Sequence, residues 1–381
     1  MGLFEKFDTV SHQDWLDKIE IDLKGKDFEE TLVWKTPEGI DVQPFYNNTP
    51  ANLVPTPIKE TDIWMIRESV FITTFEEANK KALLALKGGA NSLLFIGEIS
   101  TQKEMDTLLK DIQSAIIELH FYNSNPQLTS SFVNISSGSI SYDVLGEHFN
   151  SKTSHLNQNI DQIAAITSST KNIKTITVKG NYFSDKGANL IEEIAFTLAQ
   201  GVEYLNLLTE KNISPKLIAS KMQFHLGIGN NYFFEIAKIR AIRILWNTIL
   251  KQYKVEDSIV YIHSETSISN QSVEDKNYDI LRNTTRAMSA IIGGCDSLTV
   301  NPHDSTENQL DFSNRIARNI QHLLKEEAFF DKVKNPADGS YYIEQITDEI
   351  AIKSWELFQD IEAKGGFLNF LENQMNKTEK A

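Results

Sequence analysis

Short apolar runs alternate with longer amphipathic segments along most of the chain, beginning near residue 62. Each run is bounded by turn-forming residues and has the length of a buried strand. The runs span residues 63–66, 92–96, 115–121, 138–143, 173–178, 202–208, 259–262 and 297–300. Strands that alternate with helices predict a parallel sheet whose crossover connections are helical.

The segments between these runs show helical periodicity. The strongest is 232–250, where a few cationic and amide side chains form one polar stripe and nearly all remaining positions are apolar. This pattern predicts a helix that is packed on most of its circumference. A second helix is expected to follow Ser272 as its N-cap. A final helix is expected to follow Thr347 as its N-cap and to end at Gly365-Gly366.

The number and spacing of the predicted strands favour a (β/α)8 TIM barrel, an α/β fold that typically takes ~250 residues plus insertions. An open, doubly wound sheet is the alternative. The expected organisation is an N-terminal helix and extended arm at 1–60, the barrel at 61–366 and a C-terminal tail at 367–381.

The N-terminal arm combines a proline-rich stretch at 47–57 with four aromatic residues, Trp15, Trp34, Phe45 and Tyr46. The prolines exclude a continuous helix or a central strand there. Large aromatic side chains are poorly soluble when fully exposed, so the arm is expected to pack on something. Two surfaces remain open at this point: a partner subunit and the chain's own barrel.

The composition excludes some classes of binding partner and indicates the cellular compartment. The formal net charge of −15 argues against a nucleic-acid or anionic-membrane partner. No window approaches the ~20 apolar residues of a membrane span, and the N-terminus lacks the apolar core of a secretory signal. The single cysteine, Cys295, has no internal disulfide partner and is expected to be a small buried residue. A cytoplasmic location is expected.

Among candidate catalytic residues, His263 and Glu265 form the best acid/base pair. Residues i and i+2 of a strand share a face, so the carboxylate is expected near the imidazole, where it would raise the histidine pKa. The Gly-Ile-Gly-Asn turn at 227–230 is rejected as a dinucleotide site because it lacks a third glycine and follows a helix-like stretch. No Cys/His spacing typical of a metal site occurs, so no metal is expected.

Several segments, in family order, resemble the methylmalonyl-CoA mutase family of cobalamin-dependent isomerases. They are LVWKTPEGI at 32–40, VQPFY at 42–46, GIGNNYFFEIAKIRA at 227–241, FSNRIARN at 312–319, and the segment from Asn335-Pro336 to Gly339-Ser340-Tyr341-Tyr342. The resemblance implies a (β/α)8 barrel with the acyl-CoA along its axis. It also implies a separate flavodoxin-like domain that binds cobalamin through the histidine of a DxHxxG motif, and no such motif occurs in this sequence.

Matched residue by residue, the resemblance implies a degenerate active site. Asn181-Tyr182 stand where catalytic members have Tyr-His, and a family histidine is retained as His263 while the glutamine two residues on has become Glu265. The positions assigned to catalysis are Ser141, Asn181, Tyr182, His263 and Glu265. Those assigned to CoA contact are Lys221, Gln223 and His225. Near the last strand, Thr299 stands where the family has a histidine, and Ser305 stands where it has a cobalamin-contacting glutamate.

These departures imply a non-catalytic small subunit that supports a catalytic large subunit in interconverting methylmalonyl-CoA and succinyl-CoA. The partner would carry adenosylcobalamin, this chain would bind no cofactor, and the aromatic residues of the arm would contact the partner. Two alternatives stay open. One is a divergent acyl-CoA mutase that uses a separate cobalamin protein, suggested by His263. The other is a regulatory module that binds acyl-CoA, suggested by the cationic Lys221.

Overall fold

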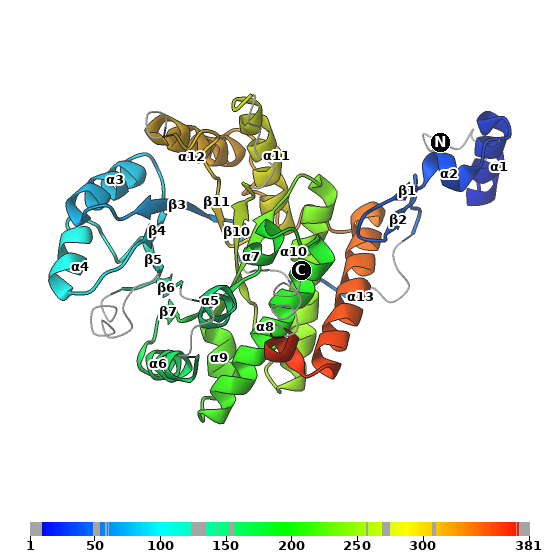
Figure 1. The fold of residues 1–381 in the computed structure, drawn as a ribbon. Coiled ribbons are helices and arrows are strands. Elements are labelled where there is room, and N and C mark those ends of the chain that lie inside the picture. The colour runs from blue at the N-terminus through cyan, green and yellow to red at the C-terminus, as the bar shows by residue number, and fades with distance from the viewer. Residues whose placement is uncertain are drawn as a thin grey trace, which may run out of the picture.

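Parallel strands close into a barrel at the centre of the computed structural model (Figure 1). The strands are β3 (Met65–Phe71), β4 (Ser92–Ile96), β5 (Glu118–Tyr122), β6 (Gly138–Ile140), β7 (Ile173–Lys174), β8 (Ile176–Lys179), β9 (Met222–Ile228), β10 (Tyr261–Thr266) and β11 (Ser297–Thr299). The structure describes residues 10–48, 54–57, 59, 61–122, 135–141, 143–151, 156–256, 258–268, 275–306, 310–370 and 372.

The sheet closes because β7 and β8 act as one strand. Only Thr175 separates them; β7 pairs with β6 on one side, and β8 pairs with β9 on the other. The order of the remaining strands is β6-β5-β4-β3-β11-β10-β9, with every neighbouring pair parallel. The predicted (β/α)8 TIM barrel is therefore confirmed, and the alternative of an open sheet is wrong.

Helices surround the barrel, as Figure 1 shows. They are α3 (Phe75–Lys87), α4 (Gln102–Leu108), α5 (Val144–Ser151), α6 (Leu156–Ser169), α7 (Asn181–Asp185), α8 (Leu190–Glu210), α9 (Pro215–Lys221), α10 (Tyr232–Gln252), α11 (Tyr278–Gly293), α12 (Leu310–Glu326) and α13 (Tyr341–Ala363). The long helix expected at 232–250 is α10, and it is buried along most of its length as predicted. Ser272, the expected cap of the helix that is α11, lies outside the described residues.

Two sequence expectations about helices were wrong. The apolar run 202–208 is not a strand but the second half of α8, which is buried on several sides because it packs against α13, α10 and the barrel. A short apolar run does not distinguish a buried strand from a buried helix. The last helix begins at Tyr341 after Ser340, so Thr347 lies buried inside it instead of capping it.

The hydrophobic core lies between the barrel wall and the helices. Side chains such as Phe95, Phe121 and Phe224 point outward from their strands and are almost fully buried. The ring of Trp246 on α10 packs edge-on against Phe224, with the ring centroids 4.9 Å apart. Gly201 of α8 faces that indole, where a Cβ atom would lie 2.9 Å from the ring. Close packing of this kind leaves the functional residues to the other face of the strands.

The N-terminal arm extends away from the barrel (Figure 1). Helices α1 (His12–Leu23) and α2 (Phe28–Leu32) bury none of their residues. The antiparallel hairpin of β1 (Trp34–Lys35) and β2 (Asp41–Val42) anchors the arm, because Ile40 and Val42 join the hydrophobic core. Among the described residues, no helix is long and apolar enough to cross a membrane.

Candidate functional site

The interior of the barrel is lined largely by polar side chains, whereas TIM barrels are usually filled by branched apolar ones. These side chains alternate with the apolar residues that face the helices. They are Arg67, Ser92, Glu118, His120, Ser139, Ser141, Thr177, Lys179, Gln223, His225, Tyr261, His263, Glu265, Ser297 and Thr299. Such a lining is costly unless its members are hydrogen-bonded to one another.

Arg67 is the centre of a network that crosses the barrel axis. Its guanidinium donates to Ser92 Oγ at 3.0 Å and lies 2.8 Å from His120 Nε2. The hydroxyl of Tyr261, on β10, lies 3.4 Å from that guanidinium and donates to Glu118 Oε2 at 2.9 Å. Because β10 and β5 lie on opposite sides of the barrel, the contact between Tyr261 and Glu118 spans the axis.

A second set of hydrogen bonds joins β5, β6 and β9 on one side of the barrel interior. Ser139 Oγ on β6 lies 2.7 Å from His120 Nδ1 and 2.8 Å from Ser141 Oγ. The amide of Gln223, on β9, donates to Ser139 Oγ at 2.9 Å and to Thr177 Oγ1 at 2.7 Å. These contacts fix the side chains that line the interior beside the bond between Tyr261 and Glu118, which crosses the axis.

Charge is balanced inside this network. Burial and the neighbouring Arg67 lower the pKa of His120 to about 4, so its imidazole is neutral at neutral pH. Burial alone would raise the pKa of Glu118, but its contacts with His120, Arg67 and Tyr261 lower it to about 2. The ionised carboxylate, 3.8 Å from the Arg67 guanidinium, compensates the buried positive charge.

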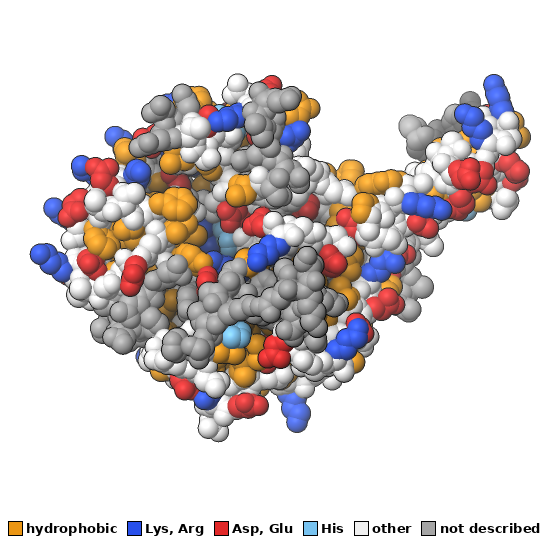
Figure 2. Space-filling model, in the orientation of Figure 1, with side chains coloured by type: hydrophobic (Ala, Val, Ile, Leu, Met, Phe, Trp, Pro, Cys, Tyr) orange, Lys and Arg blue, Asp and Glu red, His pale blue; other side chains and the backbone are white. Residues whose placement is uncertain are grey.

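Toward the carboxyl ends of the strands, the network gives way to a cavity of ≈ 180 Å³. Its wall includes Lys179, Asn181, Gln223, His225 and Glu265. A second hollow of ≈ 120 Å³ adjoins it between β3, β11 and α12 and shares some of the same wall. Figure 2 shows the hollow near the middle of the barrel, with basic side chains in blue and histidine in pale blue inside it. This is where TIM barrels hold their ligands.

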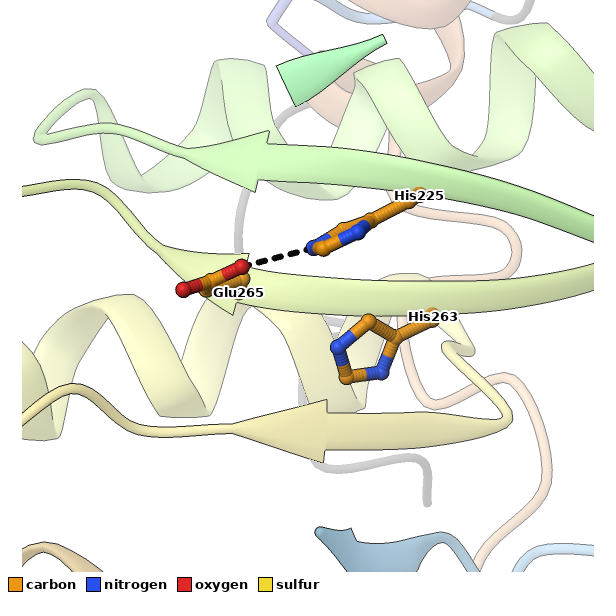
Figure 3. A group of neighbouring side chains, drawn as sticks. All are labelled: His225, His263 and Glu265. Carbon is orange, nitrogen blue, oxygen red and sulfur yellow. Dashed lines mark ion pairs between the residues drawn. The ribbon is translucent and has the colours of Figure 1, made fainter. Parts of the chain in front are cut away.

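A cluster of three side chains from this wall lies at the mouth of the barrel, where the strands end. It consists of His225, His263 and Glu265 (Figure 3). One ligand atom from each lies within 4.8 Å of the others, a spacing that allows a metal ion. Nε2 of His225 lies 2.7 Å from Oε2 of Glu265, and the two imidazole centroids are 4.5 Å apart. The cluster joins β9 and β10, which are hydrogen-bonded neighbours in the barrel.

The structure corrects the expected pairing of His263 with Glu265. The carboxylate contacts His225 instead, while Nδ1 of His263 is held by Ser297 Oγ at 2.8 Å. The pKa of His263 is not raised. Burial, together with the positive charge of Arg67 and the neighbouring His225, lowers it well below its ordinary value. His263 is therefore a neutral imidazole at neutral pH, without a carboxylate to make it a strong base.

The residues assigned to catalysis by resemblance do not all line this cavity. Ser141 and Asn181 line the cavity together with His263 and Glu265. Tyr182 is not among the lining residues: it packs on α7 edge-on to Phe183, at 5.9 Å, beneath the ammonium of Lys186. It therefore does not fill the barrel axis, which is bridged by the network around Arg67.

The residues assigned to CoA contact do not all lie in the cavity either. Gln223 and His225 point into the barrel. The Lys221 ammonium is instead held at the other end of β9, where it donates to the carbonyls of Thr170 and Lys171, both at 2.7 Å. The turn after β9 follows a strand, not a helix-like stretch as the sequence suggested. Cys295 is buried as expected, and burial raises the pKa of its thiol to about 12.

Sequence reasoning missed Arg67, Glu118, His120, Lys179 and Tyr261. The signal was present as period-two polarity: polar residues recur at alternate positions of β3, β5, β8, β9 and β10. The predicted apolar runs either ended just before these residues, as at Arg67 and Lys179, or included them without assigning them a role, as at Glu118, His120 and Tyr261. For example, the run at 63–66 stopped just before Arg67, although β3 continues to Phe71.

Comparison with known proteins agrees with this geometry. The family model described as methylmalonyl-CoA mutase matches residues 114–381. The methylmalonyl-CoA mutase small subunit of Porphyromonas gingivalis is 38% identical over 97% of this chain and 66% of its own length. The methylmalonyl-CoA mutase of Rhizobium meliloti is 29% identical over 93% of this chain and 58% of its own. The probable methylmalonyl-CoA mutase small subunit of Mycobacterium tuberculosis is 35% identical over 57% of this chain and 37% of its own length.

Similarity to solved structures is weaker. A dihydropteroate synthase of Xanthomonas albilineans aligns with a TM-score of 0.39 and 13% identity, over 70% of this chain and 94% of that one. The chain spans about three fifths of the length of the first curated relatives it matches. The family model matches more than half of the chain, and we conclude that the chain belongs to the methylmalonyl-CoA mutase family.

Proposed function

We propose that this chain is the non-catalytic small subunit of a heterodimeric, adenosylcobalamin-dependent methylmalonyl-CoA mutase. Its role is to support a catalytic large subunit that interconverts methylmalonyl-CoA and succinyl-CoA in the cytoplasm. The relatives from P. gingivalis and M. tuberculosis are both named small subunits, which supports this assignment.

The observation that carries the proposal is the bridged barrel axis. The resemblance places an acyl-CoA along this axis, but here the hydrogen bond between Tyr261 and Glu118 crosses it. Arg67, 3% exposed, fills the space beside that bond. Opening a channel would require breaking a buried ion pair and several hydrogen bonds, each of which leaves a polar group unsatisfied.

The cavity above the network also lacks the groups that the reaction would need. Asn181 replaces the family's tyrosine, and Tyr182, at the position of the family's histidine, packs away from the cavity. Loss of one positioned acid/base group or hydrogen-bond donor typically costs ~10²–10⁴ in rate. Loss of several, together with the bridged axis, favours a supporting role over turnover.

The residues at the two altered positions near the last strand, Thr299 and Ser305, do not fit contact with a cobalamin. Thr299 is buried, and its hydroxyl lies 3.4 Å from His263 Nε2, inside the barrel wall. Ser305 is exposed and offers only a short hydroxyl. We therefore place adenosylcobalamin in the partner and route no chemical step through it in this chain.

The N-terminal arm is the surface that we assign to the partner. Trp15 stacks with Phe45 at 5.3 Å, yet neither α1 nor α2 buries a residue against the barrel. Phe45 is 51% exposed and Trp34 is 49% exposed. Trp34 also contacts Phe234 of the barrel at 5.7 Å, and Tyr46 is anchored edge-on against Tyr342 at 5.6 Å. Half-exposed aromatic residues on a projecting arm are typical of interface cores.

Mixing this chain with the large subunit encoded in the same genome tests the proposal. We expect light scattering after size exclusion to give a mass equal to one copy of each chain, and mutase activity to require the large chain. The proposal would be contradicted if the two chains did not form this complex at micromolar concentrations. It would also be contradicted if the small chain showed cobalamin-dependent turnover without the large one.

A further inference from the structure

The cluster at the mouth of the barrel has the donor set of a metal site. His225 and His263 offer imidazole nitrogens and Glu265 offers a carboxylate oxygen, from two adjacent strands (Figure 3). A tetrahedral metal at ~2.1 Å from each ligand holds its donors ~3.4 Å apart, so no pair need close by more than ~1.4 Å, and the contact between His225 and Glu265, now 2.7 Å, must open by ~0.7 Å. Rigid strands carry all three residues, which keeps that closure to side-chain rotation.

The neighbours of the cluster orient it for metal binding. Ser297 Oγ lies 2.8 Å from His263 Nδ1, which leaves Nε2, 3.4 Å from Thr299 Oγ1, as the nitrogen that a metal ion would take. Asn301 donates to Glu265 Oε1 at 3.0 Å, which leaves Oε2 directed at His225. Metal-binding histidines and carboxylates commonly have such partners on their second atom.

Unsatisfied polar atoms in the cavity wall provide an independent observation. Gln223, 2% exposed, fixes its amide nitrogen on Ser139 and Thr177, and its buried Oε1 has no partner among the described residues. Oδ1 of Asn181 is buried without a partner in the same wall. Buried acceptors of this kind call for a bound ion or water.

We propose that His225, His263 and Glu265 bind one divalent transition-metal ion at the mouth of the barrel. Two imidazoles and one carboxylate form a borderline N/O donor set, which suits zinc, cobalt(II) or iron(II) better than calcium or magnesium. The cavity leaves further coordination positions open to water. This site goes beyond the proposed subunit role and does not depend on it, because it belongs to this chain alone.

The charges around the site permit a cation. Arg67 borders the same cavity, but its charge is compensated by Glu118. The Lys179 ammonium lies over the Tyr122 ring, 3.4 Å from its centroid. Glu265 supplies the compensating negative charge directly at the ligand position.

Zinc titration of the full chain, stripped of metal with EDTA, tests the proposal. Calorimetry is expected to show one Zn²⁺ per chain with a Kd below ~10 μM. Cobalt(II) in its place should give visible absorption bands of a low-symmetry site. Each of His225→Gln, His263→Gln and Glu265→Gln should weaken Zn²⁺ binding at least ~100-fold, since loss of even outer-shell partners costs 10–100-fold.

Matched controls separate this site from adventitious binding. His120→Gln removes a buried histidine of the same interior that lies outside the cluster, and His12→Gln removes an exposed one; both should retain wild-type affinity. Zn²⁺ should also raise the unfolding temperature of the wild-type chain, a measurement that needs no variant. Equal binding by wild type and Glu265→Gln, or no stoichiometric binding by the wild type, would overturn the proposal.

Discussion

Replacing Arg67 with alanine is expected to lower the free energy of unfolding by about 3–5 kcal/mol, a large fraction of a domain's stability. The change leaves the Glu118 carboxylate, whose side chain is 12% exposed, without its positive partner. It also removes donors to Ser92 and His120. Urea unfolding at neutral pH, followed by circular dichroism, measures the effect.

Two variants control this result. Arg315→Ala removes an exposed arginine that lies over the ring of Phe312, and it should cost less than ~1 kcal/mol. The double variant Arg67→Met with Glu118→Leu replaces both charges by apolar groups and should regain most of the lost stability. If Arg67→Ala were as mild as Arg315→Ala, the network would not be a structural bridge of the barrel.

Removing the chain up to Leu32 is expected to weaken binding to the large subunit at least ~100-fold while leaving the barrel folded. Helices α1 and α2 bury no residue, so their loss should change the unfolding free energy by no more than ~1 kcal/mol. Within the arm, Trp15→Ala alone should cost ~2 kcal/mol of binding, about 30-fold, as buried interface tryptophans do. Biolayer interferometry on immobilised large subunit measures both.

Leu281→Ala is the matched control for the arm. This leucine is 62% exposed on α11, away from the arm, and its loss should leave the affinity unchanged. An arm-deleted chain that still binds within threefold of the wild type would place the interface on the barrel instead. Loss of binding by Leu281→Ala would point to the same conclusion.

The architecture could be predicted because it depends on local patterns. The strand–helix alternation and the packed helix α10 follow from periodicity within single segments. The misread run at 202–208 shows the limit: α8 is apolar on several sides because of its neighbours in space, which a single segment does not reveal. The family could be identified from the sequence because its motifs are short, continuous segments as well.

The site was only partly predictable because its contacts are non-local. His263 and Glu265 do share a face of β10. However, the imidazole of His263 contacts Ser297 on β11, and the carboxylate of Glu265 contacts His225 on β9. The register that places His225 beside His263 joins residues that are far apart in sequence. No spacing rule within one strand predicts such partners, and the same holds for the bridge between Tyr261 and Glu118.

The number of acyl-CoA sites in the assembled enzyme tests the central claim, that the barrel axis of this chain is closed by its own side chains. Titration of the cobalamin-free complex with methylmalonyl-CoA by calorimetry avoids turnover and counts sites directly. The account predicts one site per pair of chains and no binding to the small chain alone. Two sites per pair, or saturable binding to the small chain, would contradict it.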